Sequence, residues 1–270
     1  MNGNDTLRLF LYCARHVGKS RFQYKVDACL ASLAVFLREA TNVVVICLTL
    51  MTFPDINGWK PGELMFMFSL LFATYGILII FFTGLRDFDK TVRSGNFDRY
   101  LLRPRGLLFQ IIASDSDWFA AIGHGGLGVF LFLLSASRIG IHWRPATAAY
   151  YFAAIVGGVL IQGAIFLSFA ALSFRFIKTE SLREVAYWNV RKFAVYPISI
   201  FPKFIQGIVI YAVPFAFVNY FPAQFMLRKQ DMAQYPEFFM YITPIVGVSM
   251  FALAYLFWKT SLRQYQSSGN

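Results

Sequence analysis

Long apolar segments alternate with short charged ones along this chain. Six stretches carry few or no charged residues: 28–53, 64–82, 118–136, 146–174, 204–227 and 238–258. An α-helix of about 20 apolar residues crosses the roughly 30 Å of hydrocarbon in a bilayer. The short alternating segments typical of a membrane β-barrel are not found. The pattern therefore predicts an all-α, polytopic membrane protein with six transmembrane helices.

The composition agrees with a membrane location. The chain has 270 residues, of which 57% are hydrophobic and only 14% are charged, whereas soluble domains carry about 25% charged residues. The net charge is +11, but the basic residues gather in the connecting loops, so we expect contact with membrane lipid and no nucleic acid partner. We predict one transmembrane domain over residues 1–270, with the six-helix bundle at 28–258 and a cytoplasmic tail at 259–270.

Lys and Arg are distributed unequally between the two sides of the predicted bundle. The N-terminal segment, the loops after the second and fourth stretches, and the C-terminal tail together hold 19 of the 25 Lys and Arg residues. The connections on the other side hold five. Because basic loops stay in the cytoplasm, we expect both termini to be cytoplasmic. An even number of spans leads independently to the same arrangement.

Two charged segments have apolar residues at helical spacing. Within residues 1–27, Leu7, Phe10 and Leu11 share one helical face, which predicts an amphipathic helix lying on the inner membrane surface. Residues 182–195 show a similar pattern. That second segment either lies on the membrane or begins the fifth span.

The loop between the second and third spans has the helix start and stop signals of two short helices joined by a turn, which we call the elbow. Gly95 suits the residue after a helix, where φ is positive. Asn96 is expected to cap a second short helix, Phe97–Leu102, and Pro104 to end it. The loop, 85–104, is either a solvated, positively charged connection or a docking element for a cytoplasmic partner.

At this loop the chain resembles the type-2 ABC exporter permeases. The resemblance rests on Arg-Ser-Gly-Asn-Phe-Asp-Arg-Tyr-Leu-Leu-Arg-Pro at 93–104, Tyr196-Pro197 and Phe201-Pro202, Pro214 and Pro222, and the closing stretch 258–269. It extends over nearly the whole chain. The loop and the closing stretch are the more specific parts, because prolines alone recur in many membrane helices.

The resemblance implies a membrane subunit of a bacterial cytoplasmic (inner) membrane exporter. Such a subunit would pair with a second copy or a sister permease, and two cytoplasmic ATPase subunits would drive it. In this family the loop after the second span carries a coupling helix that fits a groove in the ATPase. That role would fall on Phe97, Asp98, Tyr100, Leu101, Leu102, Arg103 and Pro104.

The chain itself offers no convincing enzyme, cofactor or metal site. His16-Val-Gly-Lys-Ser20 resembles the end of a phosphate-binding loop, but Cys13 stands where the first glycine is needed and no apolar strand precedes it. We therefore expect ATP hydrolysis on a separate chain, and no cofactor or metal here.

Three ionisable positions are candidates for a translocation path. Arg38 and Glu39 interrupt the first apolar stretch, either at the cytoplasmic interface or facing a cavity. His124 lies in the glycine-rich run 123–128, where we expect close helix approach and a hydrogen bond to a neighbouring helix.

An ion-gradient-driven secondary transporter is the alternative function. It would use Glu39, Asp115 or His124 as ion sites and would favour inverted repeats, which the sequence does not display. Asp115 and Asp117 precede Trp118, and helix capping at the start of the third span is the simpler role for them.

Overall fold

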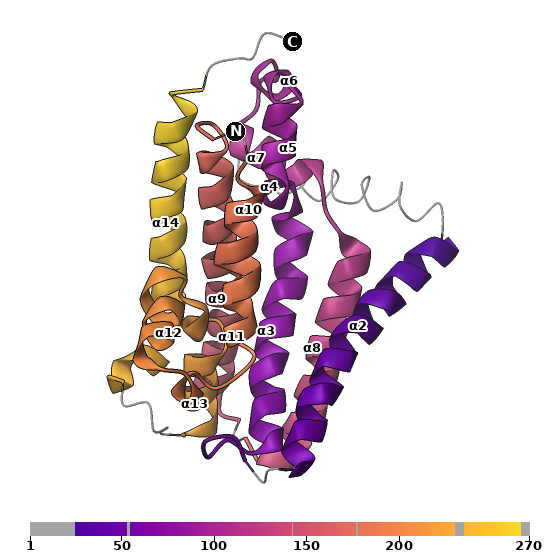
Figure 1. The fold of residues 1–270 in the computed structure, drawn as a ribbon, viewed down its shortest axis with the longest axis vertical. Coiled ribbons are helices and arrows are strands. Elements are labelled where there is room, and N and C mark those ends of the chain that lie inside the picture. The colour runs from indigo at the N-terminus through magenta and orange to yellow at the C-terminus, as the bar shows by residue number, and fades with distance from the viewer. Residues whose placement is uncertain (1–24, 53–54, 142, 177, 230–234, 266–270) are drawn as a thin grey trace.

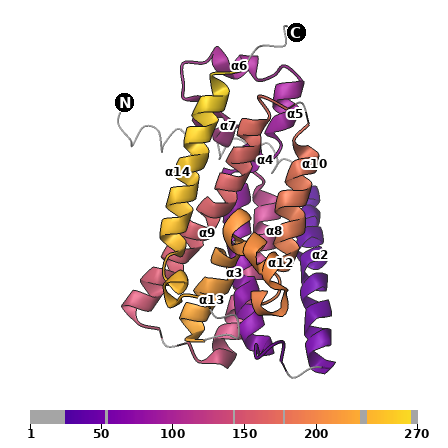
Figure 2. The same ribbon diagram turned by 60° about the vertical axis from the view of Figure 1, so that its left-hand side comes forward.

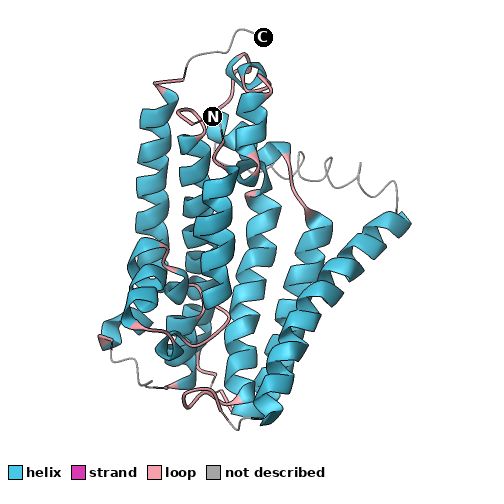
Figure 3. Cartoon of the chain, viewed as in Figure 1, coloured by secondary structure: helices cyan, strands magenta, loops and turns pink. Residues whose placement is uncertain are grey.

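The computed structural model describes residues 25–52, 55–141, 143–176, 178–229 and 235–265. Within these ranges the chain forms helices and connecting loops, and no strand is present there (Figure 3). This confirms the all-α prediction for the described part. The N-terminal amphipathic helix predicted within 1–27 lies almost wholly outside the described residues.

Five long helices form the body of the molecule (Figures 1 and 2). They are α2 (Lys25–Thr52), α3 (Pro61–Phe81), α8 (Trp118–Ile139), α9 (Pro145–Leu172) and α14 (Thr243–Leu262). The most extensive packing joins α3 to α8 and α9 to α14, while α2 leans on α8. Most of the buried apolar residues come from α3, α9 and the stretch 187–226.

Length and apolar composition qualify four described helices, α3, α8, α9 and α14, as membrane spans. A bent pair, Lys203–Ala212 with Phe215–Leu227, would count as a fifth if it is one broken span. The structure thus supports a multi-pass membrane protein with four or five candidate spans among the described residues. The described helices do not establish the predicted six spans.

The ends of the long helices follow ordinary capping chemistry. Pro61 and Pro145 occupy first-turn positions, where a missing N–H costs nothing. The Asp117 carboxylate accepts a hydrogen bond of 3.1 Å from the Ala120 N–H at the start of α8, which confirms the capping role predicted for it. Gly140, with φ of 57°, ends the same helix.

Glycines allow the backbones of α3 and α8 to come into direct contact. A Cβ added to Gly76 would lie 2.8 Å from the Cα of Gly125, and one added to Gly128 would lie 2.6 Å from the Ala73 nitrogen. The close approach predicted from the run 123–128 is therefore confirmed at these positions. Gly126 is different, since nothing lies within 4 Å of its added Cβ.

The region predicted as the fifth span is broken in several places. A continuous helical segment begins with α10 (Glu180–Arg183), passes through a π-helical stretch, η1 (Glu184–Asn189), and ends with α11 (Val190–Phe193). Tyr187 in this segment is fully buried, so the segment packs into the bundle and does not lie on the membrane surface.

The chain then breaks at Tyr196–Pro202 and bends again by 73° between Ala212 and Phe215. The pieces are η2 (Ile198–Ile200), α12 (Lys203–Gly207), η3 (Ile208–Ala212), η4 (Phe215–Phe217) and α13 (Tyr220–Leu227). The prolines explain the breaks, because each lacks a backbone N–H and clashes with the preceding turn. The four prolines of 196–227 predict that this stretch is not one straight helix, and the break at 196–202 and the 73° bend confirm it.

The elbow and the end of α14, predicted to share a side of the membrane, lie at the same end of the molecule (Figure 1). At one end the Tyr265 hydroxyl donates to Asp98 over 2.9 Å, which joins the tail to the elbow. At the other end Lys229 donates to the Gly58 carbonyl over 2.6 Å and pairs with Glu63. Arg191, Lys192 and Lys203, which the charge count assigned to the cytoplasmic side, lie away from the elbow end, in α11 and α12 (Figure 1).

Candidate functional site

The elbow between α3 and α8 is built from three short helices. They are α4 (Thr83–Arg86), α5 (Phe88–Arg93) and α6 (Asp98–Leu101). Gly95 has φ of 69°, as its position after a helix predicted. Asn96 does not cap α6, because its side-chain amide donates to the Ser94 hydroxyl over 2.8 Å. The turn is thus held by a local side-chain contact instead.

Phe97 is an inward anchor of this elbow and not part of its outer surface. Its ring is fully buried and lies 5.4 Å from Phe88, 5.1 Å from Phe174 and 4.8 Å from Tyr265, measured between ring centroids. Trp258 completes the cluster, 5.2 Å from Phe88 and 4.9 Å from Phe174. Phe97 was expected among the residues that contact the ATPase, but its buried side chain closes this aromatic core instead.

The aromatic cluster joins the two most specific stretches of the sequence pattern. Phe97 comes from the loop 93–104, whereas Trp258 and Tyr265 come from the closing stretch 258–269. Aromatic pairs in such edge-to-face geometry add about 0.5–1.5 kcal/mol each beyond buried area. The elbow is consequently fixed to the end of α14 as well as to the ends of α3 and α9.

The outer face of the elbow consists of the residues after Tyr100. Leu101 is 47% exposed and Leu102 86% exposed, and Arg103 and Pro104 are exposed beside them. The Arg103 guanidinium lies 5.6 Å from the centre of the Tyr100 ring. This apolar tip with a basic rim is the surface a partner could bind.

Gln110 supports the tip from below. It is in helix α7 (Leu107–Ser114), and its amide donates to the Tyr100 carbonyl over 3.2 Å and to the Arg105 carbonyl over 2.8 Å. The tip is thus tied at both sides to a helix that leads into α8. A displacement of the tip would be passed to that helix.

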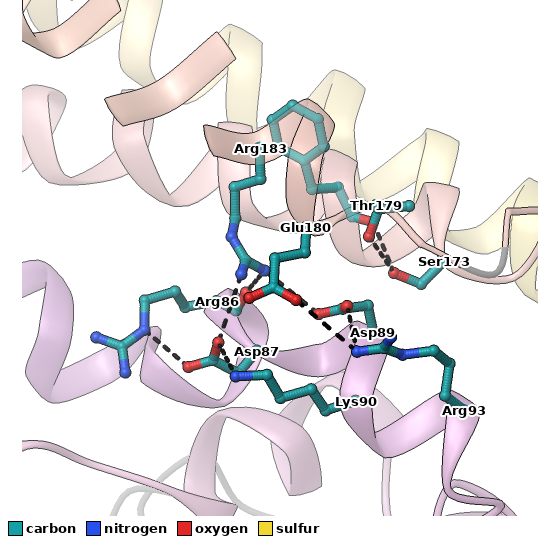
Figure 4. A network of polar contacts seen from close by, with 10 residues as sticks. Arg86, Asp87, Asp89, Lys90, Arg93, Ser173, Thr179, Glu180 and Arg183 are labelled. Carbon is teal, nitrogen blue, oxygen red and sulfur yellow. Dashed lines mark hydrogen bonds and ion pairs between the residues drawn. The ribbon is translucent and has the colours of Figure 1, made fainter. Parts of the chain in front are cut away.

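An ionic network connects the elbow to the segment that begins at α10 (Figure 4). The Arg183 guanidinium donates to the Arg86 carbonyl and lies 3.4 Å from both Asp87 and Asp89. Asp89 also pairs with Arg93 over 3.3 Å. Arg183 and Asp89 are both buried.

Three further contacts extend this network. Lys90 pairs with Asp87 over 3.3 Å, Arg93 approaches Glu180 at 3.9 Å, and Ser173 and Thr179 share a hydrogen bond of 3.0 Å (Figure 4). Burial raises the pKa of Asp87, but Arg86 first, then Lys90 and Arg183, lower the pKa below its ordinary value of 3.8. The Asp87 carboxylate is therefore held in its charged form.

A second region of interest is a cavity of about 690 Å³ between α2, α3 and the η1–α11 segment. Arg38 and Glu39 line it and pair over 3.0 Å, with Arg38 mostly exposed and Glu39 buried. Of the two positions proposed for this pair, the cavity-facing one is the one observed. Arg191, which sequence reasoning did not select, lines the same cavity.

His124 lies behind this cavity and does not line it. Its ring packs edge-on against Tyr75 at 4.7 Å and stacks with Phe72 at 6.3 Å, and Phe72 forms part of the cavity wall. Its Nδ1 atom is buried with no hydrogen-bond partner among the described residues. The hydrogen bond expected for His124 is therefore not found at Nδ1.

A buried polar chain crosses the bundle beside the cavity. The Tyr187 hydroxyl donates to Gln162 over 2.7 Å, and the Gln162 amide donates to the Thr74 hydroxyl over 3.1 Å and to the Gly158 carbonyl. These groups connect η1, α9 and α3. Because each buried polar group finds a partner, the chain fixes the position of the η1 segment in the core.

The match to a family model decides what kind of molecule this is. A model described as ABC-2 family transporter protein matches residues 36–269. The chain belongs to the ABC-2 transporter family. No curated protein and no solved structure matches it. The matched residues of this ABC-2 transporter chain include the elbow, the ionic network, the cavity and the described part of the tail.

Asp115 and Asp117 do not join this cavity. Asp117 caps α8, and Asp115 follows the last residue of α7. Neither of these carboxylates lines the cavity that holds Glu39. The three positions considered for an ion-driven mechanism, Glu39, Asp115 and His124, are thus not gathered into one site.

Proposed function

We propose that this chain is the membrane-spanning permease subunit of an ATP-driven ABC exporter. It works as a dimer, with a second copy or a sister permease, and separate cytoplasmic ABC ATPase subunits hydrolyse the ATP. The chain contributes six spans, with both termini in the cytoplasm of a bacterial inner membrane. Membership of the ABC-2 transporter family supports the permease role.

The observation that carries the proposal is the construction of the elbow. Its tip, Leu101–Pro104, is exposed, whereas its root at Phe97 is buried against Trp258 and Tyr265 of the tail region. A rigid root with an apolar tip suits a part that receives movement from a partner. Arg183 then connects the elbow to the segment leading into the broken fifth region.

In this mechanism ATP binding closes the ATPase subunits and displaces the tip. The buried Phe97 and the Gln110 hydrogen bonds pass the displacement to the ends of α3, α7 and α14. The Arg183 network passes it to α10. Movement of the η1–α11 segment relative to α2 would then open the 690 Å³ cavity toward one side of the membrane and later the other.

The test truncates the tip and compares it with a matched control. Leu101→Ala with Leu102→Ala should weaken association with the ATPase by about 1–3 kcal/mol, the scale of interface anchors. The control, Leu133→Ala with Leu253→Ala, removes two leucines that are 62% and 66% exposed on α8 and α14, outside the elbow. Association is measured by co-purification, and coupling by stimulation of ATPase activity in proteoliposomes.

Phe97→Ala distinguishes direct contact with the ATPase from structural support of the elbow. Because this ring is fully buried, its loss should lower the free energy of unfolding by about 3–5 kcal/mol, in addition to any effect on coupling. If no ABC ATPase co-purifies with the wild-type chain, or if the tip and control variants behave alike, the proposed coupling role is wrong.

A further inference from the structure

Arg191 is a cation held inside the bundle without a counter-ion among the described residues. It lies on α11, and its guanidinium carbon is 4.7 Å from the centre of the Tyr75 ring, 5.8 Å from Phe72 and 5.9 Å from Trp188. Its Nε and Nη2 atoms are buried and donate to no described acceptor. Aromatic faces attract the charge, but they leave these two N–H donors unsatisfied.

Two buried donors on one guanidinium form the fork that binds a carboxylate, sulfonate or phosphate. Leaving such donors unpaired in a low-dielectric site is unfavourable. Ionisable residues among membrane-spanning segments mark functional sites for the same reason. Both donors are covered by neighbouring side chains in this conformation, so a ligand in the cavity would supply the acceptor once the Arg191 side chain turns toward it.

The charges around the cavity favour an anion over a cation. Arg38, Arg191 and Lys192 line it, against Glu39 and Glu184. Glu39 is already paired with Arg38. Glu184 is exposed and precedes Arg191 by seven residues, roughly 10 Å along the segment, so it does not neutralise the guanidinium. Positive charge is left over at Arg191.

The remaining walls of the cavity are apolar or aromatic. Val43, Phe68, Leu71, Phe72 and Val195 line it, and its volume of about 690 Å³ is within the range of roughly 300–1,000 Å³ typical of ligand pockets. A small inorganic anion would leave these walls unused. The walls suit the apolar body of a larger molecule.

We propose that this cavity binds an amphiphile that carries a carboxylate, sulfonate or phosphate group on an apolar body, with Arg191 holding the anionic group. The inference rests on the proposed export function, for which it names the class of cargo. Phe72, Tyr75 and Trp188 position the guanidinium, and the apolar walls between α2 and α3 take the body of the ligand. The ligand comes either from the surrounding lipid leaflet or from solution.

Binding is tested with the full chain in phosphatidylcholine nanodiscs. The probe is cis-parinaric acid, and its alcohol and amine analogues carry the same chain without the negative charge. Energy transfer from the protein tryptophans, which include Trp188 in the cavity wall, reports binding above that of empty nanodiscs. The acid should bind about tenfold or more tightly than the alcohol, the scale of a charge-assisted hydrogen bond, and the amine should bind most weakly.

Two pairs of variants locate the site. Arg191→Gln should remove the preference for the acid, Arg191→Lys should keep part of it, and Arg144→Gln, at the exposed start of α9, should keep all of it. Val45→Trp should block binding of both the acid and the alcohol, whereas Val44→Trp should not. Val44 and Val45 are 53% and 55% exposed neighbours on α2, and only Val45 lines the cavity.

Equal binding of acid and alcohol to the wild type, or an unchanged preference in Arg191→Gln, would overturn the proposal. If Arg191→Gln does not fold, the Val44 and Val45 pair with the wild-type charge preference decides it. Adding phosphatidylglycerol to the nanodiscs identifies the source, because displacement of the probe indicates a lipid headgroup and its absence indicates a soluble amphiphile. These outcomes are independent of whether an ABC ATPase co-purifies, so failure here is distinguishable from failure of the export proposal.

Discussion

At the scale of single residues, Arg183 binds three polar groups of the elbow. It contacts Asp87, Asp89 and the Arg86 carbonyl. Asp89 has a side chain only 1% exposed and depends on Arg183 and Arg93 for neutralisation. A buried carboxylate without its cation is costly, so the two residues should be energetically coupled.

We predict that Arg183→Met lowers the free energy of unfolding by about 2–3 kcal/mol, somewhat less than the 3–5 kcal/mol typical of breaking a buried pair. The smaller figure follows because Arg93 still lies 3.3 Å from Asp89. Asp89→Leu should have a similar effect alone. The double variant should lose less unfolding free energy than the two single variants lose when their losses are added.

The measurement is a double-mutant cycle from thermal unfolding in detergent. Arg175→Met is the control, since Arg175 is an exposed arginine of the same region that the network in Figure 4 does not include. Strict additivity of the Arg183 and Asp89 effects would show that their contact contributes nothing.

Residue-scale prediction succeeded where local chemistry determines the outcome. A positive φ at Gly95 and capping by Asp117 follow from short-range backbone rules. Arg183 and Arg191 were counted in the sequence only as part of the basic cytoplasmic excess. Nothing local distinguishes them from solvated loop arginines, because their partners lie about 95 and 115 residues away.

At the scale of elements, the contact between α3 and α8 depends on missing side chains. Gly76 and Gly125 face each other, and a Cβ on Gly76 would meet the Gly125 backbone at 2.8 Å. Gly126 is the next residue along α8, is exposed, and has open space around its own added Cβ. The two positions thus offer the same substitution with and without a helix neighbour.

We predict opposite signs for Gly76→Ala and Gly126→Ala. Alanine is favoured over glycine in a helix by about 1 kcal/mol, so Gly126→Ala should be neutral or stabilising. Gly76→Ala should instead lower the free energy of unfolding by about 1–3 kcal/mol, because the helices must separate. Thermal midpoints of the purified variants decide the matter, and equal shifts would contradict the close packing.

Element prediction was strongest for α3, α8, α9 and α14. Their observed bounds lie within a few residues of the apolar stretches, because an unbroken apolar run has only a helix available to it in a bilayer. The fifth region was harder. The prolines predicted breaks, but the π-helical stretch Glu184–Asn189 and the 73° bend depend on packing around Tyr187 and on neighbouring helices.

The elbow was predicted as an element, but the burial of Phe97 was not. Phe97, Tyr100 and Leu101 are equally apolar in the sequence, and only the arrival of Phe174 and Tyr265 from distant segments buries Phe97. The exposed tip therefore shifts toward Leu102, which is 86% exposed against 47% for Leu101.

At the scale of the whole molecule, the two ends differ in chemistry. One end gathers the elbow, the Arg183 network and the tail, and the other gathers the short connections around Gly58 and Lys229 (Figures 1 and 2). The cavity with Arg191 lies between α2, α3 and α11. Under the proposed function, force would pass from the elbow tip through the Arg183 network to this cavity.

The placement of these ends in the cell is the last prediction. The elbow, the loop before α10 and the tail carry ten of the 21 described Lys and Arg residues, and basic loops remain in the cytoplasm. In the structure these segments lie together, joined by the Arg183–Asp89 and Tyr265–Asp98 contacts. All of these segments must therefore lie on the same side of the membrane.

In a variant whose native cysteines are replaced by serine, new cysteines at Arg263 and Leu182 should resist a membrane-impermeant thiol reagent in intact cells and react after the cells are opened. Cysteines at Lys60 and Arg144, both exposed at the opposite end, should react in intact cells. Protection of all four in intact cells, followed by reaction on opening, would place both ends on the inner side and contradict a bundle that crosses the membrane. Reaction of Arg263→Cys and protection of Arg144→Cys would invert the molecule, and an elbow outside the cell could not receive force from a cytoplasmic ATPase.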